Sequence, residues 1–220
     1  MSGGGATRPG KIVAVGLNYR NHVAEAGLEV PRTPLLFAKL PSSVIGDGDP
    51  IVIDRAQTQR VDWEVELAVV VGRAMRDVAQ ADALDHVGGY AVANDVSARD
   101  VQAAESQLLR AKSFDTFCPL GTPVPAAAVA DPQALRLRTR VNGETVQDST
   151  TAEMVFGVAE LLAYLSRSFT LEPGDVVLTG TPPGCGEFMD PPRSLRHGDV
   201  VEVEIDGVGT LRNPVVEVGA

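Results

Sequence analysis

Apolar and polar residues alternate along several stretches of the chain, which is the pattern of strands that bury one face. Residues 135–149 repeat this alternation on both sides of Asn142-Gly143, a dipeptide that favours a tight hairpin turn. Clusters of glycine, proline and aspartate separate the other stretches. We predict strands at residues 11–16, 34–39, 50–53, 61–72, 88–96, 135–149, 174–184, 198–207 and 209–218.

Helical periodicity is strongest at residues 150–168, where Thr150 and Glu153 have the spacing of a capping box. Shorter helices are expected at residues 18–27, 77–87 and 97–109. Their predicted ends include Asn18 and Ser97 as N-caps and Gly27 as a stop. One apolar stripe of the longest helix would consist of Met154, Val155, Val158, Leu161, Leu162 and Leu165.

Strands outnumber helices, and the sequence contains no internal repeat, long linker or low-complexity block. The pattern therefore predicts an α+β, β-rich fold with a single domain over residues 11–220. Residues 1–10, MSGGGATRPG, are polar and rich in glycine, and we expect a flexible leader there.

The stretch VDWEVELAVVVG, residues 61–72, is a strand pattern that carries Glu64 and Glu66 on the same face as Ala68 and Val70. Two carboxylates ~7 Å apart on a strand repel by about 2.4 kcal/mol at an effective dielectric of about 20. Burial raises this cost unless a cation or a basic side chain compensates. Either this end of the strand meets water, or a positive group lies beside it.

The same spacing recurs at Glu202 and Glu204, just before a turn, and a solvated strand face is the simpler interpretation there. Spacing alone does not distinguish the two pairs. Asp95, at the polar end of an apolar strand, is a candidate third carboxylate for the first pair. Three carboxylates without a cysteine partner describe a site for a hard cation, Mg²⁺ or Mn²⁺.

His22 and Glu25 lie three residues apart on a predicted helix and are therefore neighbours on one face. A carboxylate beside a histidine raises its basicity and fixes its tautomer, although an exposed helix pair is the alternative. Lys112 lies among apolar and aromatic residues. Its ammonium group would either stabilise a developing oxyanion or extend to solvent.

Arg99 and Gln102 share one face of the helix predicted after Asp95, so they could reach an anion held at the metal. The alternative is that Arg99 pairs with Asp95 or Asp100. Thr181 lies in the turn TGTPPG, which lacks the spacing of a phosphate loop but offers backbone N–H groups and a hydroxyl to a carboxylate.

Composition narrows the class of ligand. The formal net charge of -10 argues against nucleic acid, and an anionic substrate would need a local positive site. Cys118 and Cys185 form no CxxC pair, which excludes a thiolate zinc site and suits a reducing compartment. The sequence has neither an apolar signal segment nor an apolar run of about 20 residues, so we expect a cytoplasmic protein without a membrane span.

Taken together, these segments resemble the fumarylacetoacetate hydrolase family, especially its short acylpyruvase-like and hydroxymuconate isomerase-like members. The similar stretches cover nearly the whole chain in order: VGLNYRNHVAEAG, FAKLPSS, DWEVELAVVVG, GGYAVANDVSARDVQ, RAKSFDTFCPLG, VNGE, LEPGDVVLTGTPPG and GDVVEVEIDGVGTLRNPV. The resemblance implies a mixed β-roll or β-sandwich fold of the family's C-terminal domain type. It also implies Mg²⁺ or Mn²⁺ as cofactor and a homodimer.

The resemblance further implies a role for each candidate residue. By position, Glu64, Glu66 and Asp95 match metal ligands, His22 and Glu25 match a dyad that activates water, Lys112 matches a lysine that stabilises an enolate, and Arg99, Gln102 and Thr181 match substrate-binding residues. The expected substrate is a small anionic keto acid.

The implied reaction is hydrolysis of a C–C bond in acylpyruvate-type β-diketo acids, with water activated by the His-Glu dyad. The same pocket suits isomerisation, tautomerisation or decarboxylation of hydroxymuconate-type or oxaloacetate-type keto acids in aromatic catabolism. A non-catalytic, metal-dependent binding protein is the alternative from another class. The complete set of acidic, basic and cationic residues argues against it.

Overall fold

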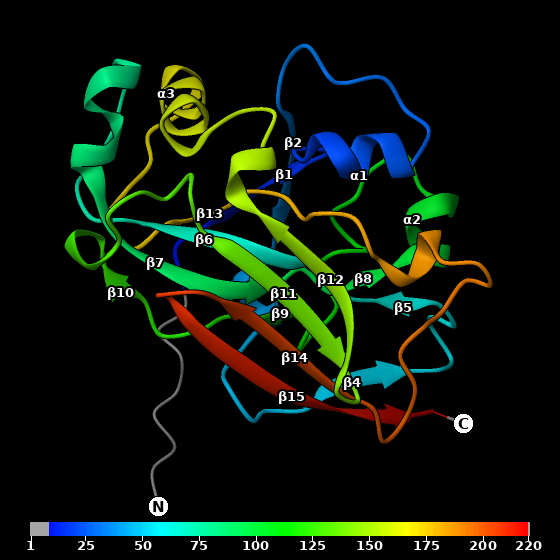
Figure 1. The fold of residues 1–220 in the computed structure, drawn as a ribbon. Coiled ribbons are helices and arrows are strands. Elements are labelled where there is room, and N and C mark those ends of the chain that lie inside the picture. Colours follow the sequence, from blue (N-terminus) through cyan, green and yellow to red (C-terminus); the bar gives the residue numbers. More distant parts are fainter. Residues whose placement is uncertain (1–8, 220) are drawn as a thin grey trace, which may run out of the picture.

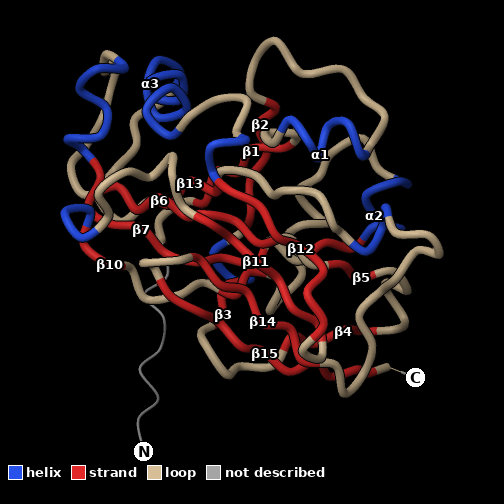
Figure 2. The backbone as a smooth tube through the Cα atoms, viewed as in Figure 1, coloured by secondary structure: helices blue, strands red, loops and turns tan. Residues whose placement is uncertain are grey.

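The computed structural model describes residues 9–219, so most of the predicted leader lies outside the described residues. Two sheets form the body of the molecule, and α1 (Arg20–Glu25), α2 (Arg99–Ala104) and α3 (Val158–Ser168) lie along one side of them (Figures 1 and 2). The fold is α+β and β-rich, as the alternation of the sequence predicts.

The larger sheet has six strands and combines parallel and antiparallel pairs. Its central strands are nearly continuous runs of valine, leucine and alanine, because both faces of this sheet are covered. In spatial order the strands are β10 (Val124–Pro125), β7 (Val87–Asn94), β6 (Val65–Val71), β13 (Val176–Leu178), β1 (Ile12–Gly16) and β2 (Leu35–Lys39).

The second sheet has five strands and alternates buried with more exposed residues, since only one of its faces packs inward. Asn142 and Gly143 have positive φ angles and form the predicted hairpin turn. In spatial order the strands are β12 (Glu144–Thr150), β11 (Arg136–Val141), β14 (Val200–Ile205), β15 (Gly209–Val218) and β4 (Ile51–Asp54).

The main core lies between the two sheets, where β6 and β7 contact β11, β14 and β15. Leu67 and Val92 meet Leu137, Val203 and Leu211 in this layer. Two short pairs complete the strands: β3 (Val44–Ile45) with β9 (Cys118–Pro119), and β5 (Val61–Asp62) with β8 (Ser97–Ala98).

Several predicted helix ends are wrong. Asn18 does not cap α1, because its side chain bonds to the backbone of Phe156 and to Thr179 O instead. Ser97 belongs to β8 and donates its hydroxyl to Asp95 O, so α2 begins at Arg99 without a side-chain cap. These polar side chains satisfy neighbours in the tertiary structure rather than the nearest helix.

Two predicted helices also differ in extent. Residues 77–87 yield a 3₁₀ helix at Gln80–His86 rather than an α-helix. Thr150 caps only the 3₁₀ turn Thr151–Glu153, and α3 begins later, after Gly157. Gly27 does end α1, in the left-handed conformation expected of a stop. Further 3₁₀ turns lie at Pro41–Ser43, Ala126–Ala128 and Gly186–Phe188.

Candidate active site

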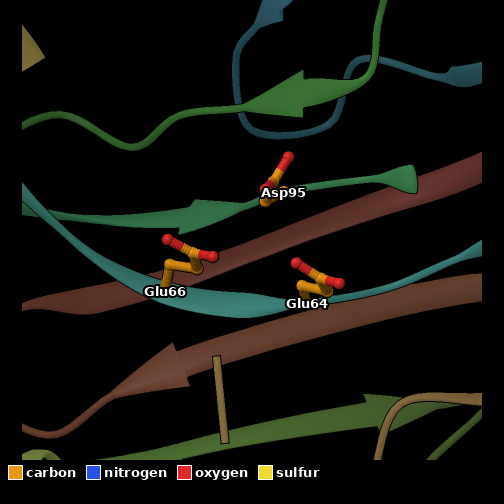
Figure 3. A group of neighbouring side chains, drawn as sticks. All are labelled: Glu64, Glu66 and Asp95. Atoms are coloured by element: carbon orange, nitrogen blue, oxygen red, sulfur yellow. The ribbon is translucent and has the colours of Figure 1, made fainter. Parts of the chain in front are cut away.

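Strand pairing brings the three candidate carboxylates together. Val65 pairs with Asn94 across β6 and β7, and Asp95 N donates to Glu64 O at 2.9 Å. Glu64 and Glu66 project from one segment towards the neighbouring segment that carries Asp95 (Figure 3). One oxygen of each of these three buried side chains lies within 4.8 Å of the others. The strand end therefore forms a carboxylate cluster rather than a solvated face.

Lys112 and Arg99 supply the positive charge that this cluster needs. Lys112 Nζ donates to Glu64 Oε2 at 2.7 Å and to Asp95 Oδ2 at 2.8 Å. Arg99 Nη2 donates to Glu64 Oε1 at 2.6 Å. Lys112 is buried, so the alternative in which its ammonium group extends to solvent is wrong.

Lys39 is a further cation at the site, and no pattern in the sequence selects it. It is the last residue of β2, where a lysine after apolar residues is typical of a strand end in water. Its side chain is instead fully buried, and Nζ donates to Asp95 Oδ1 at 2.5 Å. Both oxygens of Asp95 are thus held by ammonium groups.

Asp62 is the second residue that sequence reasoning missed, although it lies on the same strand face as Glu64 and Glu66. Its buried carboxylate accepts from Arg99 Nε at 2.9 Å, from Gly186 N at 2.8 Å and from Glu187 N at 3.0 Å. Arg99 therefore pairs with Asp62 and Glu64, and not with Asp95 or Asp100. Its position ties α2 to the strand of the carboxylates.

The electrostatics of the cluster differ between its two glutamates. Burial disfavours the charge of Glu64, but Lys112 and Arg99 outweigh burial and lower the pKa of Glu64 to about 2. Burial, with the charges of Asp95 and Glu64, raises the pKa of Glu66 well above its ordinary value of 4.5. Of the two glutamates, Glu66 is thus the one that favours a proton.

The charge balance fits a divalent cation. Four buried carboxyl groups face three cations: Asp62, Glu64, Glu66 and Asp95 against Lys39, Arg99 and Lys112. A proton on Glu66 balances these charges, and a divalent ion can replace that proton and leave a net positive site. The three convergent side chains, Glu64, Glu66 and Asp95, offer only oxygen atoms as ligands. Such a set can hold a hard cation such as Mg²⁺ or Mn²⁺.

His22 and Glu25 form a hydrogen-bonded pair on α1, with Nδ1 3.0 Å from Oε2. His22 is only 7% exposed although Glu25 is an exposed residue, so the interpretation as a wholly exposed helix pair is wrong. The other oxygen of Glu25 accepts from Gly184 N at 2.9 Å. Phe188 lies edge-on to the imidazole, 5.4 Å between ring centroids, and limits how the ring can tilt.

Gly184 joins this pair to the carboxylate strand. Its φ of +99° is in the left-handed region, and a Cβ there would lie 1.9 Å from Val146 O. While its N–H donates to Glu25, its carbonyl accepts from Trp63 Nε1 at 3.1 Å. Only glycine fits this close approach to the hairpin.

In the part of the chain that the structure describes, Gln102 and Thr181 each keep a donor without an acceptor beside the cluster. Gln102 Oε1 accepts from Arg99 Nη1 at 3.0 Å, which leaves its NH₂ group. Thr181 Oγ1 accepts from Gln147 Nε2 at 3.0 Å, which leaves its O–H. Gln147, another residue not selected from the sequence, also accepts from Val65 N at 3.1 Å and so links β12 to β6.

A cavity of about 290 Å³ unites these groups. It is lined by the candidate site residues other than Glu25 and Asp95, both of which bond to lining residues. Its rim carries the exposed apolar side chains of Leu28, Leu35 and Phe188. The size suits a small metabolite, with charge at one end and apolar groups at the other.

A larger groove of about 800 Å³ runs beside Val70, Leu120 and Leu211. Among residues 9–219, its lining includes Asp47 and Asp49 but no lysine, arginine or histidine. It does not match a small anion, so the smaller cavity is the candidate active site.

Residues 11–216 match the family described as the C-terminal domain of fumarylacetoacetate (FAA) hydrolase. The chain belongs to the fumarylacetoacetate hydrolase family. A relative from Xenopus laevis, "Oxaloacetate tautomerase fahd2, mitochondrial", is 50% identical over 213 residues, which are 96% of this chain and 66% of the relative. The chain thus spans about two thirds of the length of this relative.

Solved structures in the family have the same fold. The 5-carboxymethyl-2-hydroxymuconate delta-isomerase from Mycobacterium smegmatis is 42% identical, with a TM-score of 0.86 over 97% of this chain and 81% of that one. A fumarylacetoacetate hydrolase from Exiguobacterium antarcticum is 42% identical, with a TM-score of 0.86 over 96% and 76% of the two chains. Family membership therefore makes this chain an enzyme without fixing its reaction.

The homodimer and the cytoplasmic compartment remain predictions, as does the absence of a nucleic-acid partner. In residues 9–219, none of the helices has both the length and the apolar character that a membrane crossing requires.

Proposed function

We propose that this chain is a divalent-metal-dependent tautomerase that interconverts the enol and keto forms of a short anionic 2-oxo acid such as oxaloacetate. The relative from Xenopus laevis carries that activity in its name. The observation that carries the proposal is that His22, Glu64 and Glu66 line one cavity. Keto–enol exchange needs an acid–base group opposite a site that stabilises negative charge on oxygen.

Glu64, Glu66 and Asp95 would hold Mg²⁺ or Mn²⁺, which supplies Lewis acidity towards the 2-oxo group. The remaining work belongs to the side chains around it. Lys112 lines the cavity, and its ammonium group donates to the oxygen on which enolate charge develops.

His22 moves the proton. Its Nδ1 is bonded to Glu25, so Nε2 is the nitrogen that exchanges a proton with the substrate. In the direction of the keto form, the enol hydroxyl loses its proton and carbon C3 gains one, and the composition of the substrate is unchanged. Glu25 stabilises the imidazolium formed between these two transfers.

Gln102 and Thr181 orient the substrate. Within residues 9–219, the NH₂ group of Gln102 and the hydroxyl of Thr181 are donors that have no acceptor. They suit the carboxylate beside the 2-oxo group. Arg99 acts indirectly, because its donors serve Asp62, Glu64 and Gln102.

Hydrolysis of an acylpyruvate is the second candidate. A histidine backed by a carboxylate also suits the activation of water, and the relative from Exiguobacterium antarcticum is named a hydrolase. Water would attack the distal carbonyl, and the C–C bond would break to leave pyruvate enolate and a carboxylic acid. Decarboxylation would proceed through the same enolate, with CO₂ as the leaving group.

The test follows three reactions with the full chain and Mg²⁺. Loss of enol-oxaloacetate absorbance reports tautomerisation, loss of acetylpyruvate reports hydrolysis, and pyruvate formed from oxaloacetate reports decarboxylation. We expect tautomerisation to have the largest kcat/KM and to stop when a chelator is added. A larger kcat/KM for acetylpyruvate would make hydrolysis the function instead.

A histidine variant tests the assigned base. His22→Asn should lower kcat for tautomerisation by about 10²–10⁴-fold while sparing metal affinity, because the side chain moves the proton and holds no ion. His86→Asn is the matched control, since His86 bonds to Ala74 O away from the cavity. Normal kcat in His22→Asn would remove this residue from the mechanism.

A further inference from the structure

Two lysines hold the same aspartate in different ways. Lys39 Nζ has three acceptors: Asp95 Oδ1 at 2.5 Å, Val96 O at 3.3 Å and the backbone oxygen of Lys112. An ammonium group has three donors, so Lys39 has none left for a ligand. Its side chain is 0% exposed, which makes it a fixed part of the protein interior.

Lys112 lies where its ammonium group can give way to a divalent ion. It lines the cavity, and its Nζ lies 5.2 Å from the centroid of the Phe37 ring. Its two carboxylate acceptors are Glu64 Oε2 and Asp95 Oδ2, which belong to two of the three side chains that converge as candidate ligands. It therefore occupies one oxygen of each of two candidate metal ligands.

Asp95 does not line the cavity, whereas Lys112, which bonds to its Oδ2, does. The side chain of Asp95 is 0% exposed, whereas Glu64 and Glu66 line the cavity. A divalent ion and an ammonium group that share the same carboxylate oxygens repel each other strongly in a buried site. The ammonium group of Lys112 must leave Asp95 Oδ2 for an ion to bond there.

We propose that Lys39 is a positioning residue of the metal centre and that Lys112 is an exchangeable counter-ion. Lys39 holds Asp95 by Oδ1 and keeps Oδ2 aimed at the site. Lys112 neutralises Glu64 and Asp95 until the divalent ion takes their oxygens, and its ammonium group then turns to the cavity. The inference rests on metal binding and not on which reaction follows.

A simpler model, in which only the charges of the two lysines affect metal binding, predicts a different result. Each lysine contributes one positive charge next to Asp95, so removing either one would strengthen cation binding if charge were all that mattered. If Lys39 positions Asp95 and Lys112 competes with the ion, the two substitutions should change metal affinity in opposite directions. Lys39→Met should weaken metal binding, whereas Lys112→Met should strengthen it.

The experiment is titration of the metal-free full chain with Mn²⁺, followed by the electron paramagnetic resonance signal of free Mn²⁺, and with Mg²⁺ by calorimetry. Removing a group that orients a metal ligand typically costs 10–100-fold in metal affinity, and we expect that range for Lys39→Met. We expect about tenfold tighter binding for Lys112→Met, which lacks the competing cation. Lys11→Met is the matched control, because Lys11 pairs with Asp175 away from the cluster.

Circular dichroism would reveal a methionine variant that fails to fold, and a second pair of variants is used in that case. Lys39→Gln and Lys112→Gln keep a neutral donor and should shift affinity in the same opposite directions, by smaller factors. Equal signs for the two positions, or no change at Lys39, would overturn the inference. Opposite signs without tautomerase activity would keep it and remove only the proposed function.

Discussion

Two segments of this molecule carry the same Glu-x-Glu spacing in opposite surroundings. Glu64 and Glu66 are 5% and 1% exposed, and Asp95 lies beside them on the neighbouring segment. Glu202 and Glu204, on β14, keep 32% and 26% of their side chains exposed. The spacing determines only that two carboxylates share a face. The neighbouring strand determines whether that face becomes a buried acidic cluster or a set of partly exposed ion pairs.

The neighbour of β14 supplies complementary charge. Arg138 pairs with Glu204 and Arg140 with Glu202 across β11 and β14, in direct cross-strand register. Each of these glutamates has an arginine partner on the neighbouring strand, and the pairs face partly to solvent. The neighbour of Glu64 instead brings another acid, so that cluster requires cations from other segments and retains capacity for a divalent ion.

The largest difference between the two Glu-x-Glu segments is expected when one glutamate is removed from each. Glu64→Ala should lose metal affinity and lower turnover by about 10³-fold or more, because a ligand that would hold the Lewis acid is gone. Glu202→Ala should leave both unchanged. Calorimetric titration with Mg²⁺ and the tautomerase assay measure the two effects, and metal affinity retained in Glu64→Ala would exclude it as a ligand.

Removing one arginine from each segment compares the stability of the two networks. Arg99→Met removes the guanidinium group that pairs with both buried Asp62 and buried Glu64, and we expect a loss of about 3–5 kcal/mol in the free energy of unfolding. Arg140→Met breaks only half-exposed pairs and should cost less than about 1 kcal/mol. Urea unfolding of the metal-free proteins measures both, and equal losses would contradict the distinction.

The pH dependence of stability should single out Glu66. Its pKa is raised in the folded state, so its contribution to stability is present at low pH and is lost as pH rises from 4.5 through the folded-state pKa. The slope for one proton is at most about 1.4 kcal/mol per pH unit. Metal-free wild type should lose stability relative to Glu66→Gln over this range, as measured by urea unfolding. Parallel curves would show that Glu66 is ionised throughout.

The sequence predicts those parts of the site that depend on a single strand or its neighbour. Alternation puts Glu64 and Glu66 on one face, and a polar residue at the end of the next strand is Asp95. The three cations come from β2, α2 and the segment after it, and their meeting depends on tertiary packing. No spacing rule connects Lys39 to Asp95.

Polar side chains near helix ends show the same limit. Asn18 and Ser97 have the chemistry of N-caps, yet their donors and acceptors are used by Phe156, Thr179 and Asp95. Local preference is worth about 1 kcal/mol for a cap, and a buried backbone group without a partner costs as much or more. Burial therefore decided these hydrogen bonds.

The backbone of Gly184 has a consequence for anyone who redesigns this enzyme. It serves Glu25 through its nitrogen and Trp63 through its oxygen, and the hairpin leaves no room for a side chain. An insertion just before Gly184 would disturb both the His22–Glu25 pair and the strand that carries the carboxylates. Chain length is better added beyond Phe188 at residues 190–192, which are exposed and do not line the cavity.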